Sequence, residues 1–179
     1  MPFDHQYPLL DDWPRRGSAG REDGLWLASL DADGQEEESL RNAAEVGHVP
    51  AMHAHGLKRQ DRREKKRWLR DAAHEGYVPA MYDFAILCEE PRHRHAWLRR
   101  AADGGHLEAI YRLGLESDTK EERRQYFLKA AEEGHIPAMY ELGMLCTDRR
   151  ERDKWLQEAA RHGCEAAIVE LAETERSLA

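Results

Sequence analysis

The chain has 179 residues, of which 41% are hydrophobic and 35% charged, with a formal net charge of -8 and a mean hydropathy of -0.85. This length suits a single domain or a short repeat array. The negative charge argues against nucleic acid or anionic membranes as default partners, and the low content of valine, isoleucine and threonine excludes a mostly β protein. No apolar run approaches the roughly 20 residues that span a bilayer, and the first residues lack a signal-peptide pattern, so we expect a cytoplasmic protein.

An internal repeat sets the organisation of the chain. Segments that begin at Ala43, Ala72, Ala101 and Ala130 align without a gap at a period of 29 residues, and a shorter fifth segment begins at Ala159. Glycine keeps the same register, at positions 47, 76, 105, 134 and 163. A fixed period of this length is typical of stacked units that bury a continuous core between neighbours.

Each unit is predicted to contain two helices. The first is exemplified by PAMYELGMLC at 137–146 and opens at a proline, whose preset φ suits the first helical position. The second helix is predicted to end at the repeat glycine, and in three units its N-cap is followed at the third position by glutamate, as in a capping box. The predicted N-caps of the second helices are Asp61, Glu90, Thr119 and Asp148.

The sequence therefore predicts an all-α fold, a right-handed α-solenoid of helix-turn-helix repeats. We expect an irregular N-terminal tail at 1–21 and a degenerate capping unit at 22–42. Polar outer faces on the two terminal units would cap the array. The predicted repeats are 43–71, 72–100, 101–129 and 130–158, followed by a C-terminal half repeat at 159–179.

The string AAEEGHIPAMYELGMLC resembles the Sel-one-like repeat (SLR) family of tetratricopeptide-type helical repeats. Family units carry the pattern A-A-x-x-G-x-x-x-A-x-x-x-L-G and are usually longer, with a glycine-rich loop between the two helices that this chain lacks. The resemblance implies a role in protein–protein interaction. The residues that match the pattern are Ala130, Ala131, Gly134, Ala138, Leu142 and Gly143.

The function implied by this resemblance is a scaffold or adaptor, here a cytoplasmic bacterial one, that binds a segment of another protein. An immunity or chaperone-like protein that neutralises a toxin or effector is the alternative. A remote alternative is a β-lactam hydrolase-like enzyme, since some family members have been linked to that reaction. The chain shows no serine or metal site for such an enzyme.

The first helices are expected to carry the binding face. At about 100° per residue, an apolar arc that includes Ile86 covers most of the first helix in the second repeat and leaves Asp83 and Leu87 outside it. In tetratricopeptide-like solenoids the first helices line a concave groove, so this exposed strip would contact the partner. Tyrosines at its border are either recognition residues or packing residues between units. The predicted partner-binding residues are His53, Lys58, Tyr82, Asp83, Leu87, Tyr111, Arg112, Glu116, Tyr140, Glu141 and Leu145.

The remaining residue patterns point to no catalytic or metal site. His53 and His55 point away from each other on a helix, while His48, His106 and His135 share a turn position one or more units apart, where a hydrogen-bonding role is expected. The three cysteines lack CxxC spacing, and no phosphate loop, GxSxG or HExxH motif occurs. We therefore predict no enzyme activity, no metal and no cofactor.

The basic run KRQDRREKKRWLR at 58–70 is the one candidate for phosphate binding. It follows the acidic segment at 31–38, so ion pairs between neighbouring helices or a solvated face are the favoured interpretations, and no nucleic-acid partner is expected. A column of small residues is predicted to allow close helix packing, because glycine inside a helix costs about 1 kcal/mol relative to alanine. This column consists of Gly56, Ala85, Gly114 and Gly143.

Overall fold

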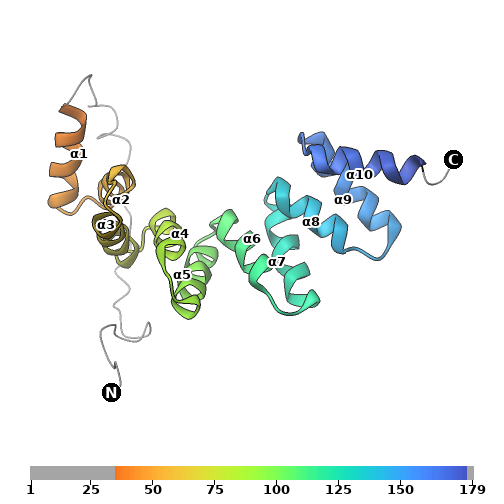
Figure 1. Ribbon diagram of the computed structural model, residues 1–179, viewed down its shortest axis with the longest axis horizontal. Helices are drawn as coiled ribbons and strands as arrows, with labels where there is room; N and C mark the ends of the chain where they lie inside the picture. Colours follow the sequence, from red (N-terminus) through yellow and green to blue (C-terminus); the bar gives the residue numbers. More distant parts are fainter. Residues whose placement is uncertain (1–34, 177–179) are drawn as a thin grey trace, which may run out of the picture.

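The computed structural model describes residues 35–176, which form ten α-helices and no β-strand (Figure 1). The predicted tail at 1–21 and most of the capping unit at 22–42 lie outside the described residues. The helices are α1 (Gln35–Glu45), α2 (Val49–Lys58), α3 (Arg62–His74), α4 (Val78–Leu87), α5 (Pro91–Asp103), α6 (Leu107–Glu116), α7 (Lys120–Glu132), α8 (Ile136–Leu145), α9 (Arg149–Arg161) and α10 (Glu165–Arg176). We call α2, α4, α6, α8 and α10, which begin 29 residues apart, the first helices, and α3, α5, α7 and α9 the second helices.

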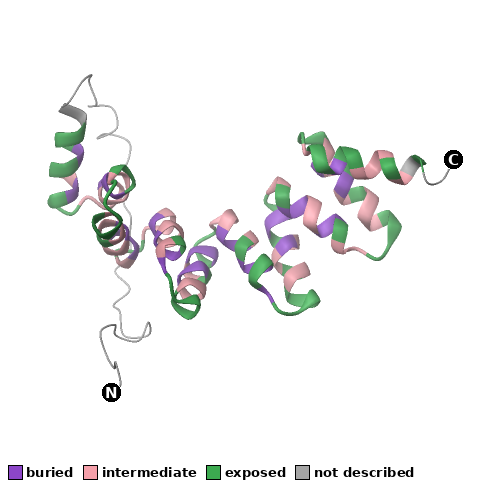
Figure 2. Ribbon diagram, viewed as in Figure 1, coloured by how far each residue is buried: buried purple, intermediate pink, exposed green. Residues whose placement is uncertain are grey.

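The helices stack in a row in chain order. Each helix packs mainly against the helices before and after it in sequence, and α1 and α10 lie at opposite ends of the row (Figure 1). Buried residues line the sides on which neighbouring helices meet (Figure 2). The chain is therefore an all-α helical-repeat solenoid, as the period predicted. None of the helices between residues 35 and 176 is both long enough and apolar enough to cross a lipid bilayer.

The first helices begin one residue before the prolines on which the prediction was based. In three units the N-cap is a histidine. Nδ1 of His48, His106 and His135 accepts a hydrogen bond from the backbone N–H three residues on, at 3.2 to 3.3 Å. This bond satisfies one of the N–H groups that a helix start leaves without a partner. The turn histidines therefore have the hydrogen-bonding role that the sequence suggested.

The second helices start at the predicted caps. Side-chain oxygens of Asp61, Thr119 and Asp148 accept a hydrogen bond from the backbone N–H of the glutamate three positions on, at 2.9 to 3.2 Å. These bonds are the forward half of the predicted capping box. Glu90 makes no such cap bond, and Pro91 follows it as the first helical residue, where its missing N–H costs nothing.

Each second helix is followed by a glycine in the left-handed backbone region. At Gly76, φ is +91°, a conformation that residues with a Cβ rarely adopt. The N–H of Gly76 donates to the carbonyl of Ala73, and the N–H of Tyr77 donates to that of Ala72. This Schellman arrangement closes the helix and reverses the chain into the next unit.

The core lies between the two helices of each unit and between neighbouring units. Its large members on the second helices include Leu69, Leu98, Phe127 and Leu156, each at most 1% exposed. A Cβ built on Gly114 would lie 2.5 Å from Cε1 of Phe127, so only glycine allows this close approach. The small column is therefore a packing column, as predicted.

The C-terminal end differs from the polar cap that the sequence suggested. Ile168 and Val169 on α10 are 50% and 54% exposed. At the equivalent positions of the preceding unit, Met139 and Tyr140 pack against the core. The difference arises because no helix follows α10 within the described part of the chain to cover these side chains.

Candidate functional site

An apolar column runs along the outward side of the first helices. Leu57, Ile86, Leu115 and Met144 occupy one equivalent position, and their exposed fractions are 45%, 42%, 48% and 45%. Two residues before Leu115, Leu113 is fully buried, because residues two apart lie on nearly opposite sides of a helix. We call the four exposed residues the outward column.

The outward column differs from scattered surface residues because its apolar side chains recur at one position in four units. Single exposed apolar residues are normal on a protein surface, whereas exposed apolar residues that gather on one face are typical of interaction sites. Helical periodicity predicted that Ile86 lies in the buried arc, and this prediction is wrong, because Ile86 is exposed. The outward side of the first helices therefore extends to the residue before the end of the predicted strip, about 100° around the helix from it.

The predicted strip lies beside the outward column and is divided between surface and core. Lys58 and Glu116 are exposed. Leu87 and Leu145, at the equivalent position in the other two units, are half-buried and pack against the core. The two leucines therefore contribute mainly to packing.

Two charged residues of the predicted strip contact the preceding unit. Nε2 of His53 and Oδ2 of Asp83 are 2.6 Å apart, and Nε of Arg112 donates to Oη of Tyr82 at 2.9 Å. In both pairs the two residues are 30 positions apart, and the later one lies on the next first helix. The structure thus brings these four predicted residues together in pairs that join neighbouring first helices.

The predicted tyrosines lie between units. Tyr82 stacks on His106 with ring centroids 4.4 Å apart, and Tyr111 lies 4.8 Å from His135 by the same measure. Tyr140 is half-buried against the core. These contacts agree with the packing alternative. Burial raises the pKa of Tyr82 and of Tyr111, so both phenols stay protonated near neutral pH.

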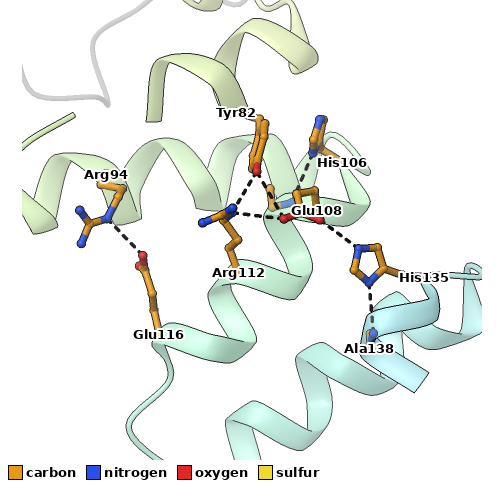
Figure 3. Close-up of polar contacts among 9 residues, drawn as sticks. Tyr82, Arg94, His106, Glu108, Arg112, Glu116, His135 and Ala138 are labelled. Carbon is orange, nitrogen blue, oxygen red and sulfur yellow. Dashed lines mark hydrogen bonds and ion pairs between the residues drawn. The ribbon is translucent and has the colours of Figure 1, made fainter. Parts of the chain in front are cut away.

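A polar network joins three successive units at this face (Figure 3). Oε1 of Glu108 lies 3.3 Å from Nε of Arg112 and accepts a hydrogen bond from the Tyr82 hydroxyl at 3.4 Å. Oε2 of Glu108 accepts from Nε2 of His135 at 3.1 Å, and Nδ1 of His135 accepts from the N–H of Ala138. Glu108 stands where α2, α4 and α8 have proline. That exception in the proline column was the one sequence signal for the network.

Two of the predicted residues, Glu116 and Glu141, are acidic. Oε1 of Glu116 accepts from Nε of Arg94 at 3.1 Å (Figure 3). The other oxygen of Glu116 lies 3.7 Å from Nδ1 of His95, so α5 reaches the end of α6. Glu141 is half-buried beside Tyr111, whose pKa is raised first by burial and then by this carboxylate.

The basic run at 58–70 makes ion pairs with α1 and with the turn between α4 and α5. Arg59 pairs with Glu37 of α1, and Nη2 of Arg62 lies 3.2 Å from Oε1 of Glu89. The pair with Glu37 matches the interpretation that the run is joined to the acidic segment before it.

Between residues 35 and 176, no three His, Cys, Asp or Glu side chains are placed to hold a metal ion together. Cys88 is buried, and Cys146 is half-buried. Burial raises the pKa of both thiols, which favours their protonated and less reactive form.

Solved structures with the same architecture identify the fold. A Sel1 repeat protein from Oxalobacter formigenes superimposes with a TM-score of 0.71 at 23% identity, covering 78% of this chain and 68% of the other. A protective antigen of uropathogenic Escherichia coli that displays an SLR fold gives a TM-score of 0.70 at 24% identity over 78% of this chain. The chain has the Sel1-like repeat fold.

An immunity protein from Pseudomonas aeruginosa is also similar to this chain. It gives a TM-score of 0.56 at 20% identity, covering 85% of this chain and 69% of the other. The chain spans 36% of the length of the E. coli antigen. No family model and no curated protein matches the sequence. The SLR resemblance seen in the sequence is therefore confirmed at the level of the fold.

Proposed function

We propose that the chain is a protein-interaction scaffold, a cytoplasmic bacterial adaptor or regulator that holds a segment of a partner protein against its first helices. The outward column carries this proposal: Leu57, Ile86, Leu115 and Met144 are four half-exposed apolar side chains at one position of four consecutive first helices. Covering them removes apolar surface from water, which is the main favourable contribution to most protein association.

The arrangement of the column favours an elongated ligand. Its side chains come from successive units that each pack against their neighbours, so the column runs along the solenoid. An extended or helical segment can contact several units at once, whereas a small molecule needs a concave site that surrounds it. Of the residues predicted from the sequence, the exposed Lys58, Arg112 and Glu116 would form part of the polar rim of the interface.

Affinity capture with quantitative mass spectrometry tests this function. The baits are the wild type, the double variant Ile86→Glu with Leu115→Glu, and a control with the same two added charges on exposed second-helix residues, Gln125→Glu with Gln157→Glu. A partner should be retained by the wild type and the control and lost by the column variant, while the thermal midpoint of all three stays similar. Retention of every partner by the column variant would contradict the proposal.

A second candidate role is that of an immunity protein that neutralises a toxin or effector. The similarity to the P. aeruginosa immunity protein, which extends over 85% of this chain, favours it. Both roles use a protein-binding face and differ in what the captured partner does. A partner that is toxic when expressed alone and harmless when expressed with this chain would assign the immunity role, and a harmless partner would assign the adaptor role.

A further inference from the structure

The two sets of helices carry opposite charge. The first helices, with α10 counted as far as Thr174, hold seven acidic residues and two basic ones. Glu175 and Arg176 at the end of α10 add one charge of each sign. The second helices hold nineteen basic residues and nine acidic ones. The charges are therefore unevenly distributed: the first helices are acidic and the second helices are basic, although the net charge of the chain is -8.

Acidic residues lie along the same helices as the outward column. The two basic residues of these helices are Lys58 and Arg112, and Arg112 already contacts Glu108 at 3.3 Å. Glu173 follows Met144 by 29 residues, so the unit after the column presents a carboxylate at the equivalent position. A partner that lies along the column therefore encounters carboxylates beside it and at its end. Of the seven acidic residues, Asp83, Glu108, Glu116 and Glu141 lie on the helices of the outward column, and Glu165, Glu170 and Glu173 lie on α10 beyond its end.

The charges nearest the column determine its electrostatic potential. The second helices pack against the buried side of the first helices, which is the side away from the column. A helix with its side chains is about 10 Å thick, and charges are screened over about 8 Å at physiological ionic strength. Some second-helix cations do reach the C-terminal ends of the first helices: Arg94 pairs with Glu116, and Arg123 donates to the carbonyl oxygen of Ser117, so both are already engaged there. The first helices, which carry the column, keep an excess of carboxylates.

Resting on the proposed function, we propose that the partner segment is basic and amphipathic, with apolar side chains on the outward column and lysines or arginines beside the carboxylates. Lysine and arginine lay their alkyl stems over apolar surface while their charged ends reach a carboxylate, so they match both features of this face. Complementary charge also speeds association and rejects acidic segments. Residues 1–34 of this chain contain seven acidic and three basic residues, so their net charge opposes binding to the same face.

Three fluorescein-labelled peptides test the proposal. They share one amphipathic leucine pattern and carry lysine, glutamine or glutamate at the polar positions. Fluorescence anisotropy measures their binding to the full chain at low and at physiological salt. We expect the lysine peptide to bind about tenfold more tightly than the glutamine peptide at low salt, with a smaller difference at higher salt, and the glutamate peptide to bind weakest.

Matched charge variants locate the effect on the molecule. Glu116→Gln with Glu141→Gln removes two charges from the first helices, and Glu121→Gln with Glu132→Gln removes two exposed charges from α7. The first pair of substitutions should lower the affinity for the lysine peptide several-fold and leave the affinity for the glutamine peptide unchanged. The second pair of substitutions should change neither of these two affinities. An equal effect of both pairs would overturn the proposal, because net charge alone would explain it.

Failure of this inference can be distinguished from failure of the proposed function. Equal or tighter binding of the glutamine or glutamate peptide, still lost in the Ile86→Glu, Leu115→Glu variant, would overturn the basic partner and leave a protein-binding face. If none of the three peptides binds, or if their binding is unchanged in the Ile86→Glu, Leu115→Glu variant, both the basic partner and the proposed function are overturned. Displacement of the lysine peptide by a peptide of residues 1–34, or by salt-sensitive self-association of the chain, would assign the face to this chain itself and also overturn the proposal.

Discussion

Glu108 lies on α6 and His135 caps α8, the next first helix, and Oε2 of the carboxylate is 3.1 Å from Nε2 of the imidazole. Because Nδ1 of His135 accepts from the N–H of Ala138, the proton of the neutral ring lies on Nε2 and is donated to Glu108. The carboxylate thereby orients the side chain that caps α8. It also accepts from Tyr82, so one residue connects three successive units.

The first prediction concerns Glu108. Glu108→Ala removes the acceptor for His135 and the ion pair with Arg112, and we expect it to lower the free energy of unfolding by about 1 kcal/mol, a modest value because the pair is partly exposed. Glu108→Gln keeps an acceptor and should cost less. Urea denaturation measures both. The control is Glu121→Ala, at the second position of α7, which should stay within about 0.5 kcal/mol of the wild type. Equal losses for the two alanine variants would mean that the network contributes no stability.

The second prediction concerns Gly114. Gly114→Ala places a Cβ 2.5 Å from Cε1 of Phe127, a side chain that is 1% exposed and cannot move aside. Alanine improves helix propensity by about 1 kcal/mol, yet we expect a net loss, because overpacking typically costs about 1 to 3 kcal/mol. Gly143→Ala, whose Cβ would lie 3.0 Å from the end of Leu156, should cost less. Thermal unfolding of the two variants shows which one loses more stability. A larger loss in Gly143→Ala than in Gly114→Ala would contradict the prediction.

The third prediction concerns acid stability. Burial lowers the pKa of His55, His74 and His106 below the value of 6.5 that histidine has in an unfolded chain. Below this pH the unfolded chain binds more protons than the folded one, so the free energy of unfolding falls as the pH falls. We therefore expect the thermal midpoint to be highest above about pH 7 and to drop on acidification towards about pH 5.5.

His106→Asn tests the cause of this drop. Asparagine can also cap a helix but carries no proton in this pH range, so the variant should lose less stability on acidification than the wild type. His162→Asn is the control, because this side chain is 50% exposed, and it should show the drop of the wild type. An unchanged drop in His106→Asn would assign the pH dependence to other groups.

The fourth prediction separates the two sides of α6. Leu113→Ala removes a fully buried side chain and should cost about 2 to 5 kcal/mol. Leu115→Ala removes a side chain that is 48% exposed and should stay within about 0.5 kcal/mol of the wild type. Chemical denaturation of this pair checks the orientation of the helix. A large loss in Leu115→Ala would show that the outward column is part of the core.

The helix boundaries could be predicted because local chemistry specifies them. Asp61 and Asp148 accept hydrogen bonds from N–H groups at most three residues away, and Gly76 adopts its positive φ at the position where α3 must end. Such interactions lie within one turn, so aligned units reveal them in a single sequence. The close approach at Gly114 could be predicted in the same way, since glycine inside a helix is costly unless packing requires it.

The sequence by itself determined the period, the two helices of each unit and the residues that begin and end them. Only the tertiary structure decided that Ile86 faces outward while its neighbour Leu87 lies against the core. Both are apolar, so periodicity gives the width of the buried arc but not the rotation of α4 about its axis, which packing against α3 and α5 sets. Glu108 and His135 are 27 residues apart and meet only because stacking brings their units into contact.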